Sequence, residues 1–153
     1  MVEKRENEKL EFKKSTSELK QAIISLSSML NKNNYGVLYF GVNNEGEIVG
    51  QQIGKDTTKD ISVQIKNNIR PVINPSINII EVGSKQIIKV EVYGDDTPYS
   101  AYGRYYIRSD DEDLLMTNSQ LENFFINKNI DYSKLANELT PYVIEVIDED
   151  LLI

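Results

Sequence analysis

The sequence contains no cysteine and no histidine. Without cysteine, the chain can form neither a disulfide nor a thiolate nucleophile. Without histidine, it lacks the usual ligand of zinc sites, the base of serine–histidine hydrolysis and the side chain that most often performs acid–base catalysis. Any bound metal would therefore need oxygen ligands, which suit magnesium, manganese and calcium.

Long apolar runs are also missing. No segment is long and apolar enough to cross a bilayer, and the charged start, Met1 to Glu6, lacks the apolar centre of a signal peptide. We therefore expect a soluble, cytoplasmic protein with no membrane partner. With 153 residues, the chain is long enough for one hydrophobic core and too short for two.

Positive charge is scarce, because 17 lysines and arginines face 24 acidic residues and the net charge is −7. This balance disfavours broad, nonspecific binding of nucleic acid, which relies on a basic surface. The acidity is uneven: residues 131–153 contain six acidic residues and one lysine, which is −5 of the total. We expect one domain over residues 1–130, and an acidic extension or the start of a following element over residues 131–153.

The most informative pattern is the segment 35–50, an apolar run punctuated by glycines. Residues 37–42 carry no polar group except a tyrosine hydroxyl, which predicts a strand buried on both faces. Residues 43–46 tolerate positive φ and predict a tight turn, after which Ile48 and Val49 pair back as a hairpin.

The remaining elements follow from helical spacing, strand alternation and turn residues. The expected elements are a strand over 9–12, a helix over about 18–30 that a Ser15–Glu18 capping box begins, a helix from about 57 that Pro71 ends, a hairpin over 77–92, a short aromatic strand over 104–108 and a helix over about 118–128. The fold class is therefore α+β, with a mixed β-sheet built from hairpins and about three helices packed on it.

The end of the chain leaves alternatives open. Residues 132–139 fit a short helix, and residues 142–147 fit either a strand or the beginning of a helix. The acidic, apolar ending over 148–153 fits a docking segment or a truncation point.

Three segments occur in a characteristic order: Leu10-Glu-Phe-Lys13, the glycine-rich segment 36–50, and Pro98-Tyr99 followed by Tyr105-Tyr-Ile-Arg108. Together they resemble the Schlafen-type Alba-like DNA-binding domain, which has also been labelled a divergent AAA ATPase domain. The resemblance covers roughly residues 6–125. The resemblance implies a noncatalytic, nucleic-acid-binding module of a bacterial or archaeal transcriptional regulator or defence-type protein. Its expected partner is DNA or RNA, and a homodimer is one expected form of assembly.

The nuclease branch of this family implies an alternative function, a divalent-metal-dependent RNA endonuclease. Its two glutamates, five positions apart, match Glu6 and Glu11, which would be catalytic and would hold Mg²⁺ or Mn²⁺. Its aspartate falls at Asn44 or Asn43, amides that bring no charge and cannot act as a base. The competing interpretation places Glu6 and Glu8 in a solvated run of N-terminal charge. Whether the protein is an enzyme stays open, and no cofactor is expected outside the nuclease interpretation.

Contacts to nucleic acid need cations for phosphates and exposed aromatic faces for bases. On a strand over 104–108, alternation puts both arginines and the central tyrosine on one face. The candidate contact residues are Lys13, Lys14, Arg104, Tyr106 and Arg108. The alternative is a solvent-facing strand whose arginines pair with the acidic run at 110–113.

The negative charge and the acidic ending also fit a protein-interaction or oligomerisation module. ATP hydrolysis has no support, because the sequence contains no Gly-x-x-x-x-Gly-Lys-Ser/Thr loop.

Overall fold

The strands of the protein form two four-stranded sheets in a computed structural model that describes residues 5–138. The first sheet has the order β1 (Leu10–Lys13), β2 (Tyr35–Phe40), β5 (Lys85–Tyr93) and β4 (Ser76–Val82). The second has the order β3 (Ile69–Arg70), β6 (Ser100–Ala101), β7 (Arg104–Ser109) and β8 (Glu112–Leu115). The helices are the 3₁₀ turn η1 (Thr16–Glu18), α1 (Leu19–Asn33), α2 (Thr57–Asn68) and α3 (Asn118–Glu138). The α+β class is confirmed.

The chain divides into two compact units, Met1–Met116 and Thr117–Ile153. Both sheets, α1 and α2 belong to the first unit, and α3 belongs to the second. Thr117 and Gln120 cap α3 reciprocally, since the Thr117 hydroxyl accepts from the Gln120 N–H and the Gln120 amide oxygen accepts from the Thr117 N–H. The domain boundary expected at residue 130 stays a prediction. No helix within residues 5–138 is long and apolar enough to cross a membrane.

Only part of the structure expected at the end of the chain lies within the described residues. Helix α3 runs without a break through the helix expected at 118–128 and into the one expected at 132–139. The segments 142–147 and 148–153 lie outside the described residues.

Strand β2 occupies the middle of the first sheet, parallel to β1 and antiparallel to β5. Leu38 and Phe40 join the larger apolar core, whereas Tyr39 joins a smaller cluster on the opposite face. The prediction that this strand is buried on both faces is confirmed. The expected hairpin with residues 48–49 shrinks to a single bridge between Val42 and Ile48, because β1 and β5 already occupy both edges of β2.

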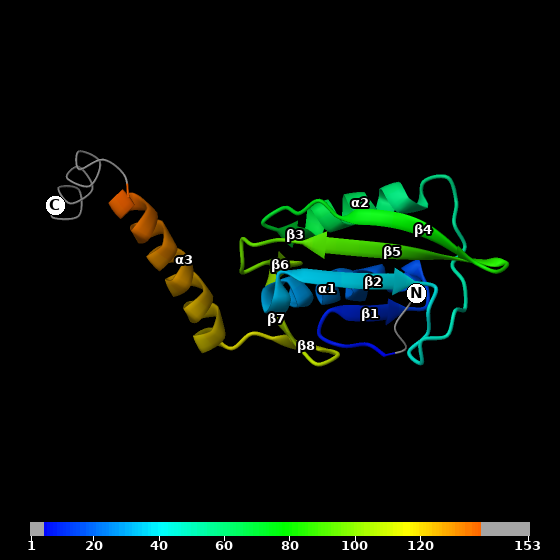
Figure 1. Ribbon diagram of the computed structural model, residues 1–153, viewed down its shortest axis with the longest axis horizontal. Coiled ribbons are helices and arrows are strands. Elements are labelled where there is room, and N and C mark those ends of the chain that lie inside the picture. Colours follow the sequence, from blue (N-terminus) through cyan, green and yellow to red (C-terminus); the bar gives the residue numbers. More distant parts are fainter. Residues whose placement is uncertain (1–4, 139–153) are drawn as a thin grey trace. The chain divides into compact units, whose positions relative to one another are not determined.

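Helix α1 is the central element of the first unit. All ten residues from Ala22 to Asn31 are buried, because α1 packs against β2 of the first sheet and against β6, β7 and β8 of the second. In Figure 1, α1 and α2 both lie behind the sheet formed by β1, β2, β5 and β4. The stretch from Ala22 to Asn31 has no solvent-exposed face, so its polar side chains must find partners inside the protein.

Those partners fix the second sheet to the helix. Buried Asn31 accepts from the Tyr99 N–H at 2.7 Å and donates to the carbonyl oxygens of Tyr99 and Tyr106 at 2.9 and 2.7 Å. The Ser27 hydroxyl donates to the Ile24 carbonyl within the helix. No buried side-chain nitrogen or oxygen of the described residues lacks a partner, as a fully enclosed helix requires.

The start of α1 differs from the expected capping box. The Ser15 hydroxyl accepts from the Ser17 N–H, and the Glu18 carboxylate accepts from the Lys14 N–H. These bonds close the 3₁₀ turn η1 first, so the α-helix begins one residue after Glu18. Asn34 ends the helix in the left-handed conformation, and its N–H bonds the Leu30 carbonyl.

Gly36 allows α1 to approach β2 closely. A Cβ atom at this position would lie 2.8 Å from the Met29 Cβ, which is tighter than packed side chains tolerate. We therefore expect Gly36→Ala to lower the free energy of unfolding by about 1–3 kcal/mol in urea titrations. Gly54→Ala is the control, because its Cβ would meet nothing closer than 3.6 Å, and it should change stability by less than about 0.5 kcal/mol. Equal stability of both variants would contradict the close packing.

Candidate functional site

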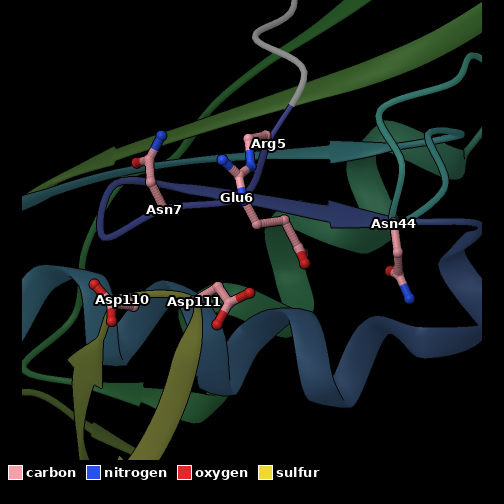
Figure 2. A pocket seen from close by; sticks show the side chains of 6 residues that line it. All are labelled: Arg5, Glu6, Asn7, Asn44, Asp110 and Asp111. Atoms are coloured by element: carbon pink, nitrogen blue, oxygen red, sulfur yellow. The ribbon is translucent and has the colours of Figure 1, made fainter.

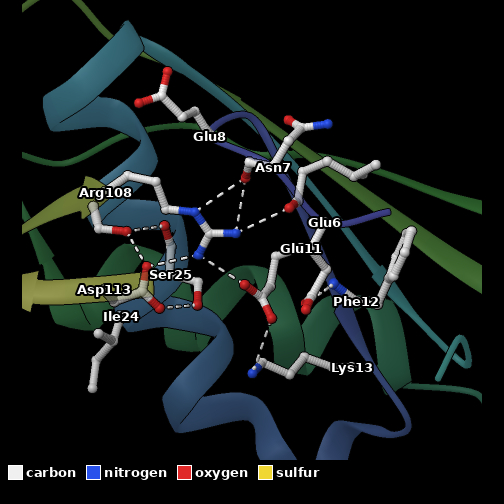
Figure 3. Close-up of polar contacts among 12 residues, drawn as sticks. Glu6, Asn7, Glu8, Glu11, Phe12, Lys13, Ile24, Ser25, Arg108 and Asp113 are labelled. Carbon is white, nitrogen blue, oxygen red and sulfur yellow. Dashed lines mark hydrogen bonds and ion pairs between the residues drawn. The ribbon is translucent and has the colours of Figure 1, made fainter. Parts of the chain in front are cut away.

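Arg108 lies inside the protein, with 0% of its side chain exposed. Its Nη1 atom is 2.7 Å from a carboxylate oxygen of Glu11 and 2.8 Å from one of Asp113. Its Nε and Nη2 atoms donate to the Asn7 carbonyl at 3.2 and 3.0 Å, and Nη2 also donates to the Leu10 carbonyl at 3.0 Å. Figure 3 shows the guanidinium enclosed by these acceptors. A buried cation is tolerated only with such complete pairing.

The same cluster includes helix α1. Asp113 accepts from the Ser25 hydroxyl at 2.5 Å and from the Ser28 hydroxyl. The cluster therefore joins β1, α1 and the β7–β8 hairpin through one guanidinium. We call Glu11, Arg108, Asp113, Ser25 and Ser28 the Arg108 cluster.

The interior position of Arg108 corrects its expected contact with nucleic acid. Alternation along β7 does place Arg104, Tyr106 and Arg108 on one side of the strand. That side packs against α1, so the strand is covered at Arg108 and open only near Arg104. The alternative pairing expected with the run 110–113 holds for Arg108, because Asp113 is one of its partners.

Lys13 is also held by the protein itself. Its ammonium lies 3.3 Å from the second carboxylate oxygen of Glu11, and only 16% of its side chain is exposed. Lys14, by contrast, is exposed. The expected phosphate contact of Lys13 would therefore compete with an ion pair that is already formed.

Burial shapes the charge states in the cluster. For Glu11, burial and a hydrogen bond from Glu6 raise the pKa to about 8, although the charges of Lys13 and Arg108 lower it. For Arg108, burial lowers the pKa, but the hydrogen bond and charge of Asp113 together with Glu11 outweigh this effect and raise it overall. Arg108 consequently stays cationic, and burial makes the charged form of Glu11 less favourable than that of an exposed glutamate.

A hollow of about 530 Å³ lies beside this cluster. It is lined by Arg5, Glu6, Asn7, Asn44, Asp110 and Asp111, and we call it the acidic depression. Figure 2 shows the Glu6 and Asp111 carboxylates facing this hollow. Glu6 also accepts from the Phe12 N–H at 2.9 Å, which holds its carboxylate against β1.

The acidic depression brings together only part of the expected catalytic set. Glu6 and Asn44 line it, whereas both carboxylate oxygens of Glu11 are paired with Arg108 and Lys13. Within residues 5–138, no group of three acidic side chains is close enough to hold a metal ion. The part of the chain described here therefore presents no ready-made metal cluster at Glu6 and Glu11.

A second hollow, of about 380 Å³, lies between α1 and β7. It is lined by Lys20, Gln21, Ile24, Tyr102, Arg104 and Tyr106, and we call it the α1–β7 depression. The Lys20 ammonium lies 5.3 Å from the centre of the Tyr102 ring, within cation–π range. The Arg104 side chain is exposed and has no hydrogen bond or ion pair with any described residue. Two cations and two tyrosines thus meet in one hollow whose lining contains no carboxylate.

The structure brings Arg104 and Tyr106 together, as the sequence predicts, and adds Lys20, which is not among the residues expected to contact nucleic acid. Helical spacing offered a signal, because Lys20 and Ile24 stand four residues apart on one side of α1. Ile24 is buried, so a lysine one turn before it should sit at the rim of the buried surface. Lys14 is not part of this lining.

Comparison with known proteins assigns the family. The family model described as Schlafen, AlbA_2 matches residues 6–117. The chain belongs to the Schlafen AlbA_2 family. The match covers the first structural unit almost completely, so both sheets, α1 and α2 make up the Schlafen AlbA_2 domain.

One solved structure shares this fold, and a second is more distantly similar. The DIP2311 protein from Corynebacterium diphtheriae has a TM-score of 0.61 and 15% identity, over 76% of this chain and 23% of that protein. The N-terminal domain of a RecG-related protein from Nitrosomonas europaea has a TM-score of 0.46 and 20% identity, over 71% of this chain and 84% of that domain. The first likeness shows a shared fold, over less than a quarter of the DIP2311 chain. No curated protein matches the sequence significantly.

Removing the cation of the Arg108 cluster should unfold the Schlafen AlbA_2 domain readily. Arg108→Met keeps most of the side-chain volume but leaves the Glu11 and Asp113 carboxylates buried without their cation. We expect the free energy of unfolding to fall by about 3–5 kcal/mol. Arg104→Met, on the same strand but exposed, should change it by less than about 0.5 kcal/mol. Similar urea midpoints for the two variants would show that the buried cluster is dispensable.

The raised pKa of Glu11 predicts a specific dependence of stability on pH. Between the ordinary value of 4.5 and the folded value of about 8, the folded protein keeps a proton that the unfolded chain has lost. The contribution of Glu11 to the free energy of unfolding is therefore complete below pH 4.5 and is lost as the pH rises through about 8. Glu11→Gln cannot titrate in this window. The stability of the wild type relative to Glu11→Gln should fall across it in urea titrations at several pH values.

The control for this pH effect is Glu45→Gln, which alters an exposed side chain in the turn after β2. Its stability should follow that of the wild type at every pH. Parallel curves for the wild type and Glu11→Gln would mean that Glu11 has no raised pKa.

Proposed function

We propose that the Schlafen AlbA_2 domain binds nucleic acid through the α1–β7 depression. The observation that carries this proposal is the exposed guanidinium of Arg104, free of any partner among the described residues, beside Lys20 and two tyrosines. Cations bind phosphates, and aromatic faces bind bases without regard to sequence. A hollow that holds both kinds of group and no carboxylate suits a chain of nucleotides.

The net charge of −7 does not oppose this proposal, because the two hollows carry opposite charge. Three carboxylates line the acidic depression, against one arginine. Two cations and no acid line the α1–β7 depression. A polyanion would be repelled from the first and attracted to the second, so the charge pattern would guide where the nucleic acid lies.

We further infer that the domain is noncatalytic and serves a transcriptional regulator or a defence-type protein, as the family resemblance implies. A catalytic Glu11 would have to exchange both Arg108 and Lys13 for a metal ion. Breaking a buried ion pair costs several kcal/mol, roughly 3–5 by the usual range. Glu11 is better suited to hold the fold together than to coordinate a metal.

Charge removal in the α1–β7 depression should weaken binding. We expect Lys20→Ala and Arg104→Ala to lower the affinity for fluorescein-labelled DNA or RNA in anisotropy titrations. Each variant should also lower the slope of log K against log salt concentration by about one, because each removes one phosphate contact. Lys59→Ala, an exposed charge on α2, is the matched control and should leave affinity and slope close to those of the wild type.

Glu6→Gln provides a second control, because it neutralises a carboxylate of the acidic depression. Its affinity should equal or slightly exceed that of the wild type. Equal losses in Lys20→Ala, Arg104→Ala and Lys59→Ala would contradict a specific site, and binding that depends on Glu6 would favour the acidic depression instead.

A further inference from the structure

The turn between β6 and β7 has an unusual residue at its first position. Ala101 pairs with Arg104, so Tyr102 and Gly103 are the two residues of a tight hairpin turn. Both have positive φ, 52° and 77° respectively, as a type I′ turn requires. Asparagine and aspartate are favoured at the first position, whereas tyrosine rarely adopts this left-handed conformation and is strained by it. This strain calls for an explanation.

Packing does not supply that explanation. Within the described residues, Tyr102 belongs to neither apolar core cluster, and it is 37% exposed. The turn is already anchored by its backbone, since the Tyr102 N–H donates to the Asn68 carbonyl at 3.0 Å. An asparagine would keep this bond and relieve the strain, so the ring is not needed for the turn.

The strained turn places the ring at the rim of the α1–β7 depression. Lys20 lies over the ring, and Arg104 begins the next strand two residues later. A nucleotide presents a flat base with phosphates on either side, so a ring that shares one hollow with two cations matches the chemistry of one nucleotide. The hollow of about 380 Å³ has the size of a small-ligand pocket and not that of a duplex groove.

We propose that Tyr102 is a stacking platform for an unpaired base, with Lys20 and Arg104 holding the adjacent phosphates. The domain then binds single-stranded nucleic acid in preference to a duplex, because base pairing hides the base faces inside the stack. This inference rests on the proposed function, and it adds the form of the ligand and the residue that selects it.

Three variants of the full chain separate stacking from charge. Tyr102→Asn removes the ring and suits the turn, so it should be at least as stable as the wild type in urea. Tyr102→Phe keeps the ring. Arg104→Ala removes charge. The probes are a fluorescein-labelled 12-nucleotide single strand of mixed sequence, as DNA and as RNA, and each probe annealed to its complement.

The wild type should bind the single strands at least about ten-fold more tightly than the duplexes. Tyr102→Asn should lose about ten-fold or more in affinity for single strands, keep its affinity for duplexes, and keep the wild-type salt slope, because it removes no charge. Tyr102→Phe should bind like the wild type. Comparison of the DNA and RNA probes will show which sugar the site accepts.

Two results would overturn the inference in different ways. In the first, Arg104→Ala weakens binding but Tyr102→Asn does not, or Tyr102→Asn lowers the affinity for single strands and for duplexes equally. Either outcome means that stacking is wrong and that the proposed phosphate site stands. If the wild type binds none of the probes at low salt, the proposed function fails together with the stacking inference.

Discussion

The architecture depends on the buried guanidinium of Arg108. Its donors meet two carboxylates and two backbone carbonyls, contributed by β1, by the segment before β1 and by the β7–β8 hairpin. Asp113 extends the pairing to two serines of α1. A charge removed from water is stable only when every partner is in place. The cluster therefore specifies one arrangement of two sheets around one helix, because any other arrangement leaves charges unpaired.

The same pairing separates the charges at the surface. Arg108 is occupied inside, so Arg104, four residues earlier on β7, is the arginine of that strand that remains exposed. The acidic run behind β7 is divided as well, since Asp113 turns inward while Asp110 and Asp111 line the acidic depression. One hairpin thus contributes to the core, to a cationic hollow and to an anionic hollow, according to which way each side chain points.

Local sequence patterns predict the helices and strands well, but they predict less well which elements pack against one another. The apolar run of β2 is long and contains almost no polar side chains, which implies burial on both faces. The strand is covered on both faces. Helix α1 was recognisable from its leucines and isoleucines, yet its serines and Asn31 look like a wet face in the sequence. In the structure Asn31 donates to the carbonyls of Tyr99 and Tyr106, and Ser25 and Ser28 donate to Asp113 of β8. A helical period alone cannot reveal these contacts.

The second sheet was missed for a related reason. Strand β8 begins in the acidic run at 110–113, a composition that normally indicates solvent-exposed chain. The run forms a strand because Asp113 pairs with Arg108 on the neighbouring strand and with Ser25 of α1, 88 residues away in the sequence. The burial of Arg108 likewise depends on packing between elements that are distant in sequence. Strand alternation identified the side of β7 on which it lies, but not that a helix covers that side.

The Arg108 cluster also constrains the order in which the chain can fold as it is synthesised. Arg108 bonds the carbonyl of Asn7 across 101 residues and that of Leu10 across 98. Until the ribosome has released the β7–β8 hairpin, Lys13 is the one of the two cationic partners of Glu11 that is present. Helix α1 then also lacks the sheet that covers its polar side. Contacts this distant in sequence form slowly because long loops must close first. The nascent domain therefore stays open until almost the whole of it has emerged, a period in which a chaperone can bind the uncovered helix.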